Sequence, residues 1–197
     1  MSIRPRRSVL YMPGANARAL EKARTLPADV VILDLEDAVA PDAKEAAQAQ
    51  VAAAVAQGGF GHREVVVRIN GLDTAWGDAD LKTLAPTGAD VILIPKVNAG
   101  ADLVAAGKAI ASAGAPDRTA VWAMMETPLA MLNAGSIAAA ATDRTTRLTG
   151  FVMGTNDLAK ETGARIVPGR APMNAWLMTS LAAARAHGLA ILDGVWN

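Results

Sequence analysis

Seven short apolar runs alternate with helix-like stretches along this chain of 197 residues, and this alternation restricts the possible folds. Several runs are continuously apolar, which is typical of parallel strands covered on both faces. Strands that alternate with helices predict βα units around a parallel sheet. The predicted strands are residues 8–12, 29–33, 64–69, 90–94, 120–125, 148–153 and 189–192, and the predicted helices are residues 15–26, 41–57, 99–113, 128–141 and 173–187.

The predicted helix boundaries carry suitable residues. Pro41 and Pro128 stand where a first-turn proline is tolerated, and Gly188 follows the last helix, where a C-terminal cap is expected. Residues 166–172, with two prolines and a glycine, predict a loop between a short helix after Asn156 and the longer helix that follows.

Seven βα-like units are nearly a complete eight-stranded barrel, which typically needs about 250 residues. We therefore expect an α/β, TIM-barrel-like fold with about seven βα units and the last strand missing. The length favours one domain, a truncated catalytic barrel over residues 1–197. Its open parallel edge is an association hazard, so the chain is either a truncated form or closes its edge with another subunit.

The composition excludes several classes of partner. Nineteen basic and nineteen acidic residues cancel, so no overall field recruits nucleic acid or an anionic membrane. No apolar stretch approaches the length that spans a bilayer. The chain has no cysteine, which excludes disulfides and thiolate metal sites and suits a cytoplasmic protein. The expected partners are small molecules and other subunits.

Polar residues collect directly after the predicted strands, where reactive groups gather in parallel α/β folds. Carboxylates after successive strands suit Mg²⁺ or Mn²⁺. A divalent ion polarises the carbonyl of a 2-oxo acid, and an arginine stabilises the resulting enolate, which is aldol or Claisen chemistry. Any one of these residues alone could be a helix cap or a surface ion pair. The polar residues that follow the predicted strands are Asp34, Glu36, Asp37, Arg68, Asn70, Lys96, Glu126, Asn156 and Asp157.

Seven motifs occur in order along the whole chain: RSVLYMPG at 7–14, ILDLEDAV at 32–39, VRIN at 67–70, IPKV at 94–97, METP at 125–128, GTNDL at 154–158 and LDGV at 192–195. Together they resemble the citrate lyase beta subunit and malyl-CoA lyase group of the HpcH/HpaI aldolase superfamily. This resemblance implies a TIM barrel that uses a divalent metal.

The resemblance also implies roles for individual residues. Glu126 and Asp157 match the metal ligands of the family, and Arg68 matches the arginine that contacts the substrate carboxylate or carbonyl oxygen. Arg68 and Glu126 are thus the expected catalytic and substrate-binding residues, with Mg²⁺, or Mn²⁺, as the cofactor. Glu36 and Asp37 either approach the metal through water or, for Asp37, cap a helix.

Three other residues each have two possible roles, and both histidines have an expected structural role. Arg18 and Lys22 lie one helical turn apart, where they either contact the phosphates of coenzyme A, as the resemblance implies, or form a solvated helix face. Lys96 either meets a substrate carboxylate or pairs with a neighbouring acid. His62 and His187 have no other candidate ligand nearby, and we expect structural roles for both.

The resemblance implies a carbon-carbon lyase that acts on a 3-hydroxyacyl thioester, of the malyl-CoA, citramalyl-CoA or citryl kind, through a metal-stabilised enolate. It also implies a homo-oligomer, a trimer or larger. Full-length relatives continue into an eighth strand, and in the malyl-CoA lyases a catalytic aspartate comes from that segment of a neighbouring subunit; this chain has no residue that matches it. Two alternatives stay open: an aldolase on free pyruvate-type acids, and a catalytically idle binding or assembly subunit.

Overall fold

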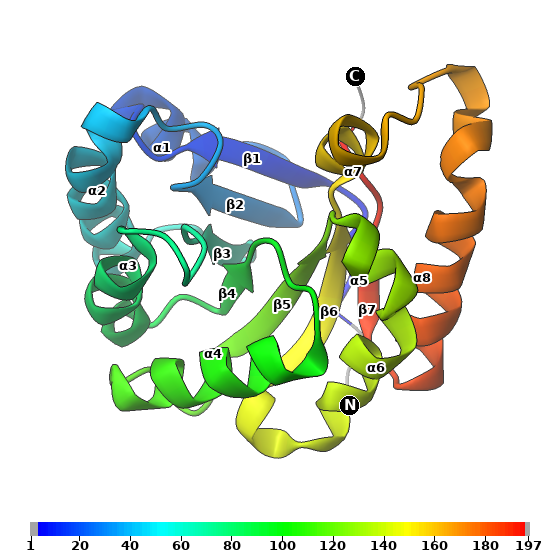
Figure 1. Cartoon of the computed structure of the whole chain (residues 1–197). Helices are drawn as coiled ribbons and strands as arrows, with labels where there is room; N and C mark the ends of the chain where they lie inside the picture. The colour runs from blue at the N-terminus through cyan, green and yellow to red at the C-terminus, as the bar shows by residue number, and fades with distance from the viewer. Residues whose placement is uncertain (1–3, 196–197) are drawn as a thin grey trace. The chain divides into compact units, whose positions relative to one another are not determined.

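The computed structural model describes residues 4–195, and within this range it contains the alternating strands and helices that the sequence predicts (Figure 1). The end of the predicted domain at residues 196–197 lies outside the described residues. The strands are β1 (Val9–Pro13), β2 (Val30–Asp34), β3 (Glu64–Arg68), β4 (Val91–Ile94), β5 (Ala120–Met125), β6 (Leu148–Met153) and β7 (Ala190–Leu192). The helices are α1 (Ala17–Ala23), α2 (Lys44–Gln57), α3 (Gly77–Leu84), α4 (Gly100–Ser112), α5 (Pro128–Leu132), α6 (Ala134–Ala139), α7 (Thr155–Thr162) and α8 (Asn174–Ala186).

All seven predicted strands are confirmed, and the α/β class with seven strand units is confirmed with them. Three helical segments differ from the prediction. The stretch 128–141 is not one helix, because Asn133 leaves helical geometry between α5 and α6. Asn16 accepts a hydrogen bond from the Ala19 amide and so starts α1 two residues later than predicted. The short helix α3 was not predicted at all.

The chain divides into two compact units, which we describe separately. The first contains the described residues up to Leu93 together with Ala109–Ala120. Its strands β1, β2, β3 and β4 pair in parallel in sequence order, and α1, α2 and α3 lie along them (Figure 1). Every residue of β2, β3 and β4 is buried, as continuously apolar parallel strands require. The register sets Asp34 opposite Arg68 at the carboxyl ends of β2 and β3.

The second unit contains Ile94–Lys108 and the described residues from Val121 onward. Its strands β5, β6 and β7 are also parallel and in sequence order, and α8 packs against β6 and β7. Trp122 and Phe151 are the largest fully buried side chains of its sheet. Met125, the last residue of β5, pairs with Met153, the last residue of β6. Glu126 and Gly154, which directly follow these strands, therefore leave the sheet side by side. No helix in residues 4–195 combines the length and apolar character needed to cross a bilayer. That residues 1–197 form a single domain stays a prediction.

Candidate active site

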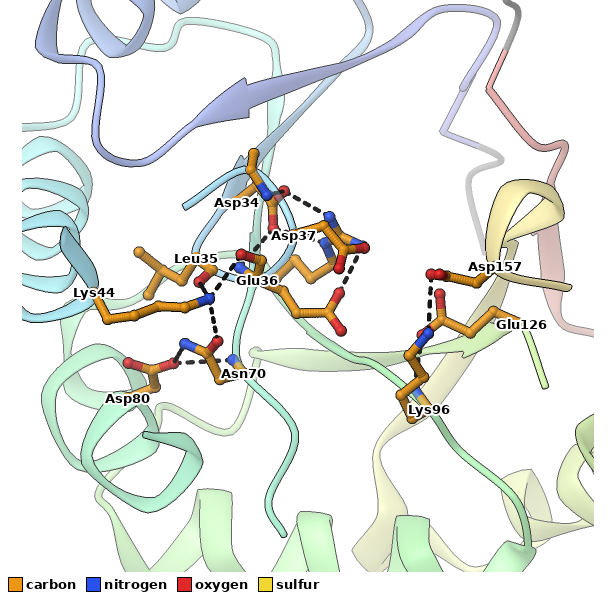
Figure 2. A network of polar contacts seen from close by, with 12 residues as sticks. Asp34, Leu35, Glu36, Asp37, Lys44, Asn70, Asp80, Lys96, Glu126 and Asp157 are labelled. Atoms are coloured by element: carbon orange, nitrogen blue, oxygen red, sulfur yellow. Dashed lines mark hydrogen bonds and ion pairs between the residues drawn. The ribbon is translucent and has the colours of Figure 1, made fainter. Parts of the chain in front are cut away.

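The residues predicted from the strand ends fall into two polar networks, one in each unit (Figure 2). The first network surrounds Arg68 and includes Asp34, Glu36 and Asp37. The second surrounds Lys96 and includes the predicted metal ligands. The structure therefore brings Glu126 and Asp157 together, whereas the place of Arg68 relative to them stays a prediction.

Arg68 ends β3 with its guanidinium buried and held by Asp34 of the neighbouring strand. Its Nε donates to Asp34 Oδ1 at 2.7 Å and its Nη2 to Oδ2 at 2.6 Å, a two-point contact that fixes the plane of the guanidinium. Asp34 also accepts hydrogen bonds from the backbone amides of Glu36 and Ala38, which shape the turn after β2. The predicted position of Arg68 at the strand end is confirmed, and its fixed orientation comes from Asp34.

The remaining guanidinium nitrogen of Arg68 faces two more acids. Nη1 lies 2.7 Å from Glu36 Oε2 and 3.3 Å from Asp37 Oδ2, while the guanidinium carbon lies 5.1 Å from the centre of the Tyr11 ring. Burial alone lowers the pKa of Arg68, but the hydrogen bonds and charge of Asp34, with the charge of Glu36, raise it above its ordinary value. Arg68 is therefore permanently cationic. Asp37 does not serve only as a helix cap, since it pairs with Arg68, and the approach of Glu36 and Asp37 to a metal ion stays a prediction.

Sequence reasoning missed Lys44, which lies buried beneath the loop that carries Glu36. Its ammonium donates to Leu35 O at 2.7 Å, Glu36 O at 2.7 Å and Asn70 Oδ1 at 2.6 Å (Figure 2). Burial lowers the pKa of Lys44, and nearby carboxylates oppose that effect. The missed signal was its spacing, because Lys44 shares one face of α2 with the buried residues Ala47, Val51 and Ala54.

Asn70 connects Lys44 to a further buried acid. Asp80 Oδ2 accepts hydrogen bonds from the Asn70 side chain at 2.6 Å and from its backbone amide at 2.9 Å, and Gln48 donates to Oδ1 at 2.8 Å. Asp80 belongs to α3, the helix that was not predicted. This network holds the loops after β2 and β3 to each other through α2 and α3.

Glu126 follows β5 and its side chain is fully buried. Its Oε1 accepts a hydrogen bond from the backbone N–H of Lys96 at 2.8 Å. Lys96 directs this N–H toward Glu126 because its backbone lies in the left-handed region, with φ of 51°, which is uncommon for a residue with a side chain. Gly154 packs against the same carboxylate: a Cβ there would lie 2.4 Å from Glu126 Cβ and 2.6 Å from Oε2. The position of Glu126 therefore depends on both of its neighbours.

The ammonium of Lys96 connects Glu126 to the first turn of α7. Its Nζ lies 2.9 Å from Asp157 Oδ2, 3.9 Å from Glu126 Oε1 and 3.8 Å from Glu161 Oε1. The structure thus favours the second interpretation of Lys96, a pair with neighbouring acids. Figure 2 shows Lys96, Glu126 and Asp157 directed toward one another.

The donor set around Lys96 fits a hard divalent cation. Mg²⁺ is usually held by one or two carboxylates and completes its shell with water and substrate oxygens. Glu126 and Asp157 already converge on one positive group. Among residues 4–195 no group of three or more His, Cys, Asp or Glu side chains is placed to hold a metal ion.

The other candidates lie where the sequence placed them. Arg18 and Lys22 are exposed on α1, so both interpretations of that pair remain open. His187 is the C-cap of α8, and Gly188 follows it with φ of 69°, as predicted. His62 is exposed, and its carbonyl accepts a hydrogen bond from Arg4. Asn156 lies in the first turn of α7.

Comparison with known proteins agrees with these motifs. The sequence model of the family described as HpcH/HpaI aldolase/citrate lyase matches residues 7–197. The (3S)-malyl-CoA thioesterase of Cereibacter sphaeroides (strain KD131) is 54% identical over 193 residues, which are 98% of this chain and 64% of that protein. The citrate lyase subunit beta of Escherichia coli (strain K12) is 33% identical over 199 residues, with 98% of this chain and 65% of that protein covered. The chain therefore spans just under two thirds of both relatives.

A solved structure supports the same likeness in three dimensions. The CitE protein of Mycobacterium tuberculosis, in complex with magnesium, acetoacetate and coenzyme A, is 31% identical and matches with a TM-score of 0.78. The match covers 98% of this chain and 67% of that one.

Proposed function

Since the chain belongs to the HpcH/HpaI aldolase/citrate lyase family, we propose that it acts with Mg²⁺ on a 3-hydroxyacyl thioester of coenzyme A, of the malyl kind. The observation that carries this proposal is the convergence of Glu126 and Asp157 on one cationic group. The similarity to a malyl-CoA thioesterase, and to a protein solved with magnesium and coenzyme A, supports the substrate class and the ion.

Each residue has a proposed role in this reaction. Glu126 and Asp157 would hold the Mg²⁺ ion, which polarises a substrate carbonyl when bound. Arg68 would contact the substrate carboxylate or carbonyl oxygen through Nη1, because its other two guanidinium nitrogens each donate to Asp34. An incoming carboxylate would replace Asp37, which is the longer of the two Nη1 contacts and the more exposed acid. Arg18 and Lys22 are the proposed contacts for the phosphates of coenzyme A.

Two bonds of such a substrate can break. We place hydrolysis of the thioester first, because 54% identity joins the chain to a malyl-CoA thioesterase. Carbon-carbon cleavage is the second candidate, and the similarity to citrate lyase subunit beta favours it. The two outcomes differ in their products. Hydrolysis of malyl-CoA releases free coenzyme A and malate, whereas cleavage releases glyoxylate and leaves the thioester intact as acetyl-CoA.

The test is to incubate the purified chain with malyl-CoA and citramalyl-CoA, with Mg²⁺ or with a chelator. Free thiol and free glyoxylate or pyruvate are measured in the same samples. We expect Mg²⁺-dependent thiol release that Glu126→Gln or Asp157→Asn lowers at least about a hundredfold, since each removes a ligand charge. Asp78→Asn is the matched control, because Asp78 is an exposed acid that pairs only with Lys82 among residues 4–195.

Three results would contradict parts of the proposal. Glyoxylate without free thiol would reverse the order of the two candidates. Turnover of free 2-oxo acids, with no saturable binding of coenzyme A thioesters, would favour the pyruvate-type aldolase. A folded chain that binds Mg²⁺ but turns over neither thioester would favour the idle binding or assembly subunit. Sedimentation measurements of the same preparation test the proposed trimer or larger homo-oligomer.

A further inference from the structure

Lys96 lies where a cation is needed in the proposed metal site. Its ammonium is 2.9 Å from Asp157 Oδ2 and 3.9 Å from Glu126 Oε1, the two carboxylates that would hold Mg²⁺. Two carboxylates directed at one point repel each other unless a positive charge lies between them. The Lys96 ammonium supplies such a charge, and its side chain is only about one third exposed, so water screens the ion pairs incompletely.

The backbone and the side chain of Lys96 act on the site in different ways. The backbone N–H donates to Glu126 Oε1 at 2.8 Å, and this contact does not depend on the side chain. The ammonium, in contrast, competes for the oxygens that a metal ion would use. A substitution that removes the ammonium leaves the backbone hydrogen bond to Glu126 in place. It therefore tests the competition between the ammonium and a metal ion without changing what positions Glu126.

A second acid offers the ammonium another position. Glu161 Oε1 lies 3.8 Å from Lys96 Nζ, one helical turn beyond Asp157 on α7, and its side chain is 40% exposed. Residues four apart on a helix project from the same face. Lys96 can therefore leave Asp157 for Glu161 by a change of side-chain rotamer, without movement of its backbone.

We propose that Lys96 is an internal counter-ion that holds Glu126 and Asp157 together in the absence of metal, yields to Mg²⁺, and then pairs with Glu161. This inference rests on the proposed metal-dependent function and adds to it a positioning residue that competes with the ion. Competition from the Lys96 ammonium makes the chain bind Mg²⁺ more weakly than the two carboxylates would bind it without Lys96. The ammonium also makes the protein without bound metal more stable than it would be without this positive charge.

The experiment measures Mg²⁺ binding to the metal-free chain by calorimetry, without substrate. Lys96→Met removes the competing charge and is expected to bind Mg²⁺ about tenfold more tightly, which corresponds to about 1.4 kcal/mol. Lys96→Arg retains a positive charge and should bind like the wild type. Lys108→Met is the matched control, because Lys108 is an exposed lysine on α4 and its loss changes the net charge by the same amount. Thermal unfolding should show Lys96→Met less stable than wild type without metal, and restored by Mg²⁺.

A double-mutant cycle tests the role of Glu161. Glu161→Gln should weaken Mg²⁺ binding several-fold in the wild type, because the displaced ammonium loses its second partner. In the Lys96→Met background the same substitution should change the affinity much less. Equal effects in both backgrounds would show that Glu161 acts on the ion directly and not through Lys96.

One measurement needs no variant at all. Mg²⁺ should increase the reactivity of the Lys96 amine toward an acetylating reagent, measured by mass spectrometry of the peptide, while the reactivity of Lys108 stays constant. The inference is overturned if Lys96→Met binds Mg²⁺ no more tightly than wild type, or if Mg²⁺ leaves Lys96 reactivity unchanged. Thioester turnover enters none of these readouts, so a chain that shows the competition but no turnover would refute the proposed reaction and not the role of Lys96.

Discussion

Gly154→Ala is the sharpest test of how the chain holds Glu126. A Cβ at position 154 would lie 2.4 Å from Glu126 Cβ, 2.6 Å from its Oε2 and 3.1 Å from Met124 Cε. Carbon atoms in contact are normally about 3.5 to 4.0 Å apart, so the glutamate has to move by about 1 Å. It has little room to move, since the side chain is fully buried and Lys96 N–H holds its Oε1 at 2.8 Å.

The expected magnitude follows from this overlap. Overpacking of a filled interior costs about 1 to 3 kcal/mol, and for a chain of this size each kcal/mol lowers the melting temperature by about 2 to 4 °C. The backbone of Gly154, with φ of −97°, lies outside the left-handed region, so the penalty is steric rather than conformational. Because metal sites tolerate ligand displacements of only about 0.2 Å, we also expect at least about tenfold weaker Mg²⁺ binding.

The assays are urea unfolding and Mg²⁺ calorimetry, with Gly135→Ala as the matched control. Gly135 lies in α6 of the same unit, and a Cβ there would meet nothing within 4 Å. That substitution should leave Mg²⁺ binding unchanged and stabilise the chain by up to about 1 kcal/mol, as expected for alanine in a helix. Wild-type stability and wild-type Mg²⁺ affinity in Gly154→Ala would refute the argument that this glycine makes room for Glu126.

Three further substitutions test the first unit, each by urea unfolding. Lys44→Met removes the donor of three hydrogen bonds, two of them buried, and should cost at least about 2 kcal/mol. Because the pKa of Lys44 is lowered in the folded state, wild-type stability rises as pH approaches 10.5, and the gap to Lys44→Met should widen with it; a constant gap would contradict the shift. Asp34→Asn leaves the buried Arg68 charge without its main partner and should cost about 3 kcal/mol or more, and a loss below 1 kcal/mol would contradict this. The hydrogen bond from Arg7 lowers the pKa of Asp29, so wild type should exceed Arg7→Ala in stability above pH 3.8, and this advantage should disappear as pH falls through the lowered pKa; an advantage that persists in strong acid would count against the pair.

The strands could be predicted because their signal is local. Each is a short, mostly apolar run, and none depends on a distant contact for its assignment. The helix α3 lacked such a signal. It has eight residues, begins at Gly77 without a side-chain cap, and is held on its one buried face by Leu81, Leu84 and the hydrogen bonds that Asp80 accepts from Asn70. Tertiary contacts stabilise it, and these are not visible in a single sequence.

The strand-end residues of the two networks were predictable, but their partners were not. A residue that follows a parallel strand must lie at the carboxyl edge of its sheet, which is why Arg68 and Glu126 could be placed. Which group each one meets depends on the loops. Asp34 faces Arg68 only because β2 and β3 pair in that register, and Lys96 reaches Glu126 through a left-handed backbone that no lysine favours intrinsically.

The charges within each network support the proposed Mg²⁺ site. Although the whole sequence has equal numbers of acidic and basic residues, acids outnumber cations in the ion pairs and hydrogen bonds described above for each network. In the first unit four acids accompany two cations, namely Asp34, Glu36, Asp37 and Asp80 with Arg68 and Lys44. In the second, three acids accompany one cation, namely Glu126, Asp157 and Glu161 with Lys96. An anionic thioester would be repelled by such surroundings, because like charges in a partly desolvated site interact strongly. A divalent cation would reverse that balance locally, and so we expect the affinity of the chain for the proposed thioester, and not only the proposed turnover, to require Mg²⁺.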